Sequence, residues 1–191
     1  ETLSSDPSCT ITSAAALQAA INALCEGLRV AYRLPAGTVL STSSAPIDRD
    51  KGVAVRLVGD GHGVTIDGGR TTRLFDLGVA GSELVLENLH LTGGRSRLGG
   101  AIRDSSPGGA SVRILDCRIT DMGSVGRDNV ASGGVIQAES GTSVEIRRTN
   151  ISNIQMTSSG GSARGGVITS NMLVMEDVLI SDVTVTATIS D

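Results

Sequence analysis

A unit of about 30 residues recurs along this chain, and it constrains the fold more strongly than any other feature of the sequence. The clearest copy reads LVLENLHLTGGRSRLGGAI over residues 84–102 and ends in the tetrad Gly99-Gly100-Ala101-Ile102. Related segments begin at Val112 and Val144, and they are followed by the tetrads Gly133-Gly134-Val135-Ile136 and Gly165-Gly166-Val167-Ile168. A fourth segment, LVMEDVLIS, begins at Leu173. Self-similarity at a fixed period of this size indicates a solenoid, in which each repeat is one coil stacked on its neighbours.

Aligning the copies places apolar residues in shared columns. One column, with steps of 28, 32 and 29 residues, holds Leu86, Ile114, Ile146 and Met175. Two further columns with the same steps hold Leu91, Ile119, Ile151 and Ile180, and Leu89, Cys117, Thr149 and Val178. Because side chains alternate along a strand, the residues between these two columns should point outward: His90, Arg118, Asn150 and Leu179. We therefore predict an all-β fold, a right-handed parallel β-helix of about five coils spaced about 4.8 Å apart.

A helix is expected before the first coil. Ser13 is a suitable N-cap for a helix from Ala14 to about Cys25, with Gly27 as its stop. Leu17, Ile21 and Leu24 fall on one apolar face, while Gln18 is expected to face away. Such a helix would cover the apolar cross-section and the unpaired strand edge of the first coil. We assign residues 1–28 to a lead-in and α-helical cap, and residues 29–191 to the β-helix.

Composition supports a single domain with an aliphatic core. Tyr32 and Phe75 are the only aromatic residues, so stacked Ile, Leu, Val and Ala must fill the interior. The net charge of −4 is modest and dispersed, which gives no support for a nucleic-acid partner. No apolar run approaches 18 residues, and hence no membrane span is predicted.

Several motifs together resemble a known superfamily. The order of a helix, LPAGTVL, VRLVGDGHGVTIDGG, LVLENLHLTGG and GGAI is similar to that of the right-handed β-helix proteins typified by pectin and pectate lyases. The GGAI and GGVI tetrads, with their repeat-defining glycines, resemble the repeats of polymorphic outer-membrane proteins and related surface adhesins. The adhesin repeats usually add a Phe-x-x-Asn motif, which does not occur here. The resemblance implies the β-helix fold, but a fold by itself does not define a function.

His62 in the GDGHG segment is one candidate for chemistry, because glycoside hydrolases of this superfamily carry Gly-His-Gly beside paired aspartates. Two carboxyl groups are needed for that reaction, one as acid and one to activate water. This chain has no Asp-Asp pair, and we interpret the segment as a glycine-rich bend that tolerates a histidine.

A lyase would require acidic oxygen ligands for Ca²⁺ and an arginine base. Asp116, Glu145 and Arg118 lie on neighbouring predicted strands. However, Arg148 shares the column of Asp116, which favours alternating charges on a solvated face. We predict no catalytic residue, no metal ligand and no cofactor.

The cysteines carry a prediction about the compartment. Cys9 and Cys25 bracket the expected helix, and we predict a disulfide between them, which implies an oxidising environment. Cys117 lies in an inward column and is expected to be a buried apolar residue. Asn150 belongs to an N-glycosylation sequon, Asn150-Ile151-Ser152, in an outward column.

These observations lead to a secreted or surface-exposed structural or adhesive β-helix, part of an extracellular matrix or larger assembly and without catalysis of its own. The alternatives are a polysaccharide-acting lyase or hydrolase of the pectin-lyase type, and a glycan-binding module; glycans are thus a further candidate partner. The near absence of aromatic residues argues against the last, since sugar faces favour rings. The segment SDVTVTATISD after Ile180 predicts a strand with an open edge, and we expect further coils or another protein subunit to cover it.

Overall fold

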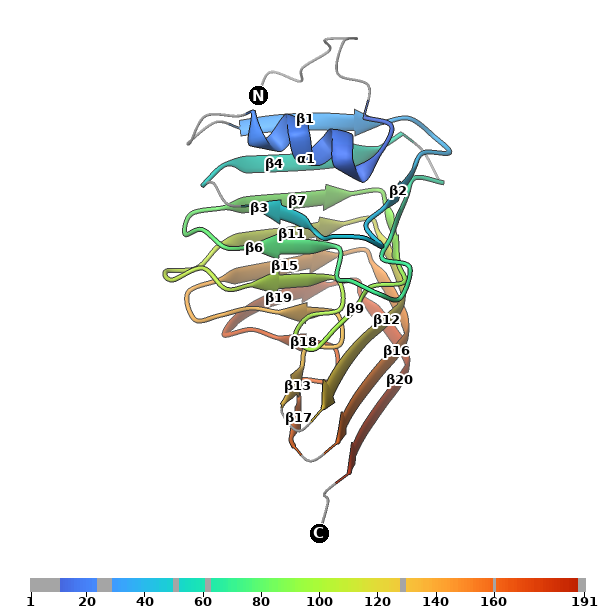
Figure 1. Cartoon of the computed structure of the whole chain (residues 1–191), viewed down its shortest axis with the longest axis vertical. Helices are drawn as coiled ribbons and strands as arrows, with labels where there is room; N and C mark the ends of the chain where they lie inside the picture. The colour runs from blue at the N-terminus through green and yellow to red at the C-terminus, as the bar shows by residue number, and fades with distance from the viewer. Residues whose placement is uncertain are drawn as a thin grey trace.

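The computed structural model describes residues 11–23, 29–49, 52–60, 63–127, 130–159 and 161–188. The chain winds as a right-handed parallel β-helix of about five coils, with a single short helix, α1, at its N-terminal end (Figure 1). The predicted fold class is therefore confirmed. Each coil contributes one strand to each of three parallel sheets, which we name A, B and C.

Sheet A forms one wall of the solenoid. Its strands, in spatial order, are β1 (Arg29–Leu34), β4 (Ala54–Gly59), β7 (Glu83–Glu87), β11 (Ser111–Leu115), β15 (Ser143–Arg147) and β19 (Met172–Glu176). The predicted column from Leu86 to Met175 is present in the register, and Tyr32 and Leu57 extend it towards the N-terminus. Period-two alternation in the sequence thus fixes which residues share a column.

Sheet B follows sheet A in each coil. Its strands are β2 (Val39–Ser41), β5 (Thr65–Asp67), β8 (His90–Thr92), β12 (Arg118–Arg127), β16 (Asn150–Ser159) and β20 (Leu179–Thr188), and the short β9 (Arg95–Ser96) also pairs with β12. The predicted column from Leu91 to Ile180 is confirmed, as is the outward column that begins at His90.

Sheet C closes each coil. It consists of β3 (Ile47–Arg49), β6 (Phe75–Leu77), β10 (Ile102–Asp104), β14 (Ile136–Gln137) and β18 (Ile168–Thr169), and a small fourth sheet pairs β13 (Ala131–Ser132) with β17 (Ala163–Arg164). The final isoleucine of each tetrad enters sheet C, so that Ile102, Ile136 and Ile168 stack below Phe75.

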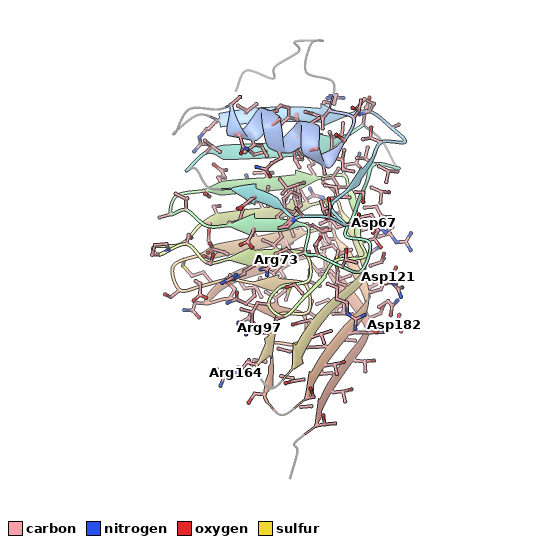
Figure 2. The ribbon with its side chains drawn as sticks, viewed as in Figure 1. Asp67, Arg73, Arg97, Asp121, Arg164 and Asp182 are labelled. Carbon is pink, nitrogen blue, oxygen red and sulfur yellow. The ribbon has the colours of Figure 1, made fainter. Side chains whose placement is uncertain are left out.

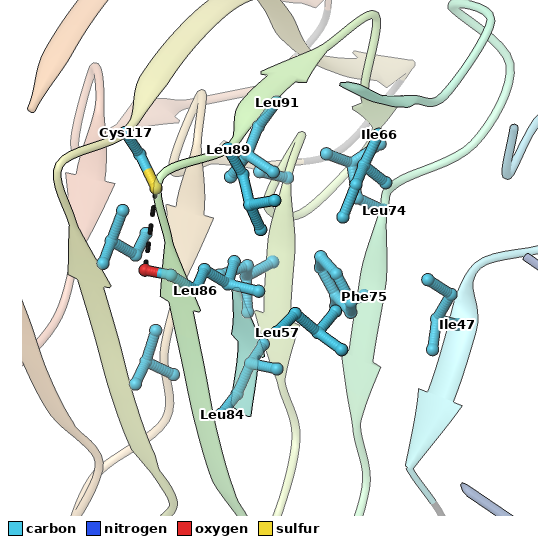
Figure 3. Close-up of a cluster of buried hydrophobic side chains, with 14 of the residues drawn as sticks. Ile47, Leu57, Ile66, Leu74, Phe75, Leu84, Leu86, Leu89, Leu91 and Cys117 are labelled. Carbon is cyan, nitrogen blue, oxygen red and sulfur yellow. Dashed lines mark hydrogen bonds between the residues drawn. The ribbon is translucent and has the colours of Figure 1, made fainter. Parts of the chain in front are cut away.

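The core is aliphatic, as the composition predicts. Leu57, Leu86 and Ile66 are fully buried, and Phe75 places the one buried phenyl ring among them (Figure 3). Phe75 takes the place that isoleucines occupy in the later coils. A single apolar cluster runs from α1 to the coil containing Ile154.

The first glycine of each tetrad has a left-handed backbone. Gly99, Gly133 and Gly165 have φ values of +65°, +56° and +58°. A Cβ atom at Gly133 would collide with the carbonyl oxygen of Ile136. The tetrad therefore repeats because only glycine fits the turn that leads into sheet C.

Helix α1 (Ala14–Asn22) covers the N-terminal end of the solenoid (Figure 1). Ser13 is its N-cap, with a side chain that accepts a hydrogen bond from the Ala16 amide at 3.1 Å, and Leu17 and Ile21 are buried. The expectation that Gln18 faces away is wrong. Its amide donates to the Asp48 carbonyl at 2.9 Å and accepts from the Asp48 amide at 2.6 Å, so the side chain satisfies the open edge of β3 as a further strand would.

Candidate functional site

The corner between sheets A and B forms an open groove on the described surface. In four successive coils a non-glycine residue with positive φ turns the chain there: Asn88, Asp116, Arg148 and Asp177. The groove has a volume of about 850 Å³, and His90, Arg118 and Asn150 line it beside three of the corner residues, Asn88, Asp116 and Arg148. The repeat thus stacks one polar side chain per coil along a solvent-exposed channel.

Two charged residues of this groove, Asp116 and Arg148, form an ion pair. Arg148 donates from Nε to Asp116 Oδ1 at 2.7 Å and from a terminal nitrogen to Oδ2 at 2.8 Å. This bidentate contact lowers the pKa of the Asp116 carboxyl, chiefly through the hydrogen bonds. The same contact raises the pKa of Arg148. The carboxylate is consequently held as an anion with both oxygens engaged, which suits a structural pair better than a general base.

His90 is the one histidine that the structure describes. Its Nε2 lies 2.9 Å from the hydroxyl of Thr120, which in turn donates to Thr92 at 3.2 Å. Burial, aided by the charge of Arg118, lowers the pKa of His90, so the imidazole is neutral at pH 7. A neutral ring in a hydroxyl chain gives the groove hydrogen-bonding capacity rather than charge.

The three residues of the lyase hypothesis do not form one cluster. Asp116 and Arg118 line the groove, whereas Glu145 lies on the outer face of sheet A. There Glu145 contacts Arg113 at 2.8 Å and Arg147 at 2.5 Å, and these contacts lower its pKa, the hydrogen bond from Arg113 most strongly. Within the described ranges, no group of three or more His, Cys, Asp or Glu side chains could hold a metal ion.

Cys117 points inward beneath the groove. Its thiol donates to the carbonyl oxygen of Leu115 at 3.1 Å and approaches that of Leu86 at 3.6 Å (Figure 3). Burial raises the pKa of the thiol to about 12. The prediction that Cys117 is a buried, unreactive residue agrees with this environment.

The other predicted residues divide into two groups. Asn150 is exposed on β16, which is compatible with a glycan at that position. Cys9, Cys25 and His62 lie outside the described residues. The predicted disulfide therefore stays a prediction.

A polar cluster on the outer face of sheet C was missed by sequence reasoning. Asp76 on β6 lies beside Arg103 on β10, and Gln137 follows on β14. A terminal nitrogen of Arg73 forms an ion pair with Asp76 at 3.5 Å. The Nε of Arg103 and the Oε1 of Gln137 are buried without a hydrogen-bond partner. Aligning LFDL with the AIRD that follows Gly99-Gly100 would have placed Asp76 beside Arg103.

Electrostatics distinguish this cluster from the rest of the surface. Burial, together with the positive charges of Arg103 and Arg97, lowers the pKa of Arg73, while Asp76 opposes the change. Figure 2 shows Arg73, Arg97 and Arg164 along one side of the solenoid and Asp67, Asp121 and Asp182 along another. The arginine side offers donors to an anion, since guanidinium groups recognise carboxylates and sulfates in pairs of hydrogen bonds.

The C-terminal end is the most apolar exposed surface. Of the nine large hydrophobic side chains exposed in the described part of the chain, eight lie on β19 and β20. Ile180 is 38% exposed although its register partner Ile151 is 1% exposed, and Met175 is 47% exposed although Ile146 is fully buried. Five of the eight lie in inward columns: Leu173, Met175, Ile180, Val183 and Val185. No described strand pairs with the outer edge of β20.

No protein-family model, curated protein or solved structure matches this chain. No helix in the described ranges is long and apolar enough to cross a membrane. The assignment of the fold therefore rests on the strand order and register of the three sheets.

Proposed function

We propose that this chain is a structural β-helix module, secreted or displayed on a cell surface, that joins other protein through its C-terminal end. The exposure of inward-facing apolar residues on β19 and β20 carries the proposal. An apolar patch of this kind, with strand edges beside it, marks an interaction surface, because its burial is favourable and its backbone groups need partners.

The groove between sheets A and B supports a non-catalytic role. Asp116 and Arg148 pair with each other, Glu87 pairs with Arg56, and His90 contacts the hydroxyl of Thr120. General acid–base catalysis needs a group positioned to exchange a proton with substrate. A repeat that pairs its charges from coil to coil serves cohesion of the solenoid instead.

An extracellular location is supported by two features of the sequence. The expected Cys9–Cys25 disulfide requires an oxidising compartment, and Asn150 stands exposed in a sequon. The resemblance to pectin-lyase-like proteins and to polymorphic outer-membrane repeats also supports an extracellular location. A relationship to these families is part of the proposal.

The experiment follows the protein in the cells that produce it. Tagged wild-type chain, extracted without denaturant, is expected to elute in size-exclusion chromatography well above its 19.4 kDa mass. A variant with Ile180→Lys and Val183→Lys is expected to elute as a monomer, since charge cannot enter an apolar interface without cost. The matched control is Gln155→Lys, on the outer face of β16, a strand that is paired on both sides. Elution of the wild-type chain as a free monomer would refute the proposed function.

A second function is favoured by the arginine cluster of sheet C. Arg73, Arg97 and Arg103 lie close enough for their charges to act on one another, and this concentration of guanidinium groups suits the anionic groups of an acidic polysaccharide. Binding of polygalacturonate and dextran sulfate, with neutral dextran as control, tests this function by calorimetry. Arg103→Gln is expected to abolish binding, whereas Arg33→Gln on β1 of sheet A is expected to leave it unchanged. Release of shorter chains from either polymer would establish an enzyme.

A further inference from the structure

The outer edge of β20 carries an unusual stretch, Val183–Thr188. It follows Asp182, where a φ of +53° interrupts the regular strand. Val183 and Val185 occupy the inward columns of Ile154 and Met156, while Thr184, Thr186 and Thr188 alternate outward. The stretch contains no charge, proline or positive φ, the features by which natural sheets keep their edges from pairing.

This stretch is complementary to itself in the antiparallel direction. With Val185 opposite Val185 of a second copy, Val183 faces Ala187 and Thr184 faces Thr186. Apolar residues then stay on the inner face and threonines on the outer face of both strands, because the side-chain period is two. β-Branched residues directly opposite one another favour such pairing.

The other end of the molecule limits how copies can add. At the N-terminal end, Gln18 of α1 already holds the amide and carbonyl of Asp48 on the edge of β3. Adding a second copy head to tail would require displacement of α1 from sheet C. Two C-terminal ends can instead meet about a two-fold axis, an arrangement that closes at two copies.

We propose that this chain forms a symmetric dimer by antiparallel pairing of the Val183–Thr188 edges of two copies. This proposal rests on the proposed function and identifies the protein that binds the C-terminal end as a second copy of this chain. The contact joins the two sheets B through their β20 strands and covers the exposed side chains of Val183 and Val185.

Sedimentation velocity of the purified 191-residue chain across a wide concentration range tests the dimer. The wild type is expected to shift from monomer to dimer and no further. The double variant Thr184→Lys/Thr186→Lys places like charges directly opposite each other across the axis, and it is expected to remain monomeric. The matched control is Gln155→Lys/Thr157→Lys on β16, whose residues are the register partners of Thr184 and Thr186 but whose strand is paired on both sides. Circular dichroism verifies that both variants fold.

The outcomes separate this proposal from the one on which it rests. A wild-type chain that stays monomeric, grows beyond a dimer, or dimerises equally with and without the β20 lysines overturns the dimer. If the purified wild-type chain is monomeric but elutes in a large complex from extracts of the cells that produce it, the proposed function stands and the partner is a different protein.

Discussion

Replacement of Leu86 by alanine tests the stacking that holds the solenoid together. Leu86 is fully buried and lies in register between Leu57 and Ile114, so the coils on both sides pack against it. The same inward column ends at Met175, which is 47% exposed. One column therefore supplies both a buried position and a matched exposed one.

The expected loss can be estimated from burial. Removing three carbon atoms from a buried leucine costs about 2.4 kcal/mol in transfer free energy, at about 0.8 kcal/mol for each methylene. The flanking strands are hydrogen-bonded on both sides and cannot close the space, so a cavity contribution brings the total to about 3–4 kcal/mol. Met175→Ala should cost only about 1 kcal/mol, because half of its surface is in water already and no closed cavity forms.

Urea denaturation followed by far-ultraviolet circular dichroism measures both variants. Tyr32 and Phe75 are the only aromatic side chains, which makes fluorescence a poor probe. Dilute protein keeps any self-association from affecting Met175. A lower midpoint for Leu86→Ala at unchanged m-value reports a loss of stability in the folded state. Equal losses at the two positions would refute the argument that stacking between coils provides the stability.

Three further predictions follow from single positions. Gly133→Ala should lower the free energy of unfolding, measured by urea titration, by more than about 2 kcal/mol, because Gly133 has a positive φ and the new Cβ would collide with the carbonyl oxygen of Ile136. Gly81 also has a positive φ but open space around it, so Gly81→Ala should cost only about 1 kcal/mol. Cys117 should resist alkylation at neutral pH until the chain unfolds, and mass spectrometry should then find one modified cysteine if the other two are bonded and three if they are free. Arg148→Met should raise the pKa of Asp116, measured by NMR titration, back towards its ordinary 3.8. Because the pKa of Asp116 is lowered in the folded chain, the ion pair stabilises the fold above pH 3.8, and this stabilisation disappears as the pH falls through the lowered pKa. The variant should no longer show that loss of stability.

The repeat in the sequence determined the coil and its columns. Leu86 and Leu91 could be assigned to inward columns because strand alternation and the tetrad spacing leave one consistent register. The positive φ of Gly99 follows from the same repeat, and the N-cap role of Ser13 follows from its place before an apolar stripe. These properties depend on neighbours along the chain and on a period, both of which a sequence displays.

Only the tertiary structure decided which polar groups meet. The side chain of Gln18 looks solvent-facing on a helical wheel, yet it hydrogen-bonds to Asp48, 30 residues away. Asp76 and Arg103 belong to different coils, and the separation of Glu145 from Asp116 depends on the bend between sheets A and B. The exposure of Ile180 likewise depends on whether a further strand lies beside it, which its own sequence does not encode. Burial and charge pairing are properties of three-dimensional neighbours, and a side chain acquires them when the coils stack.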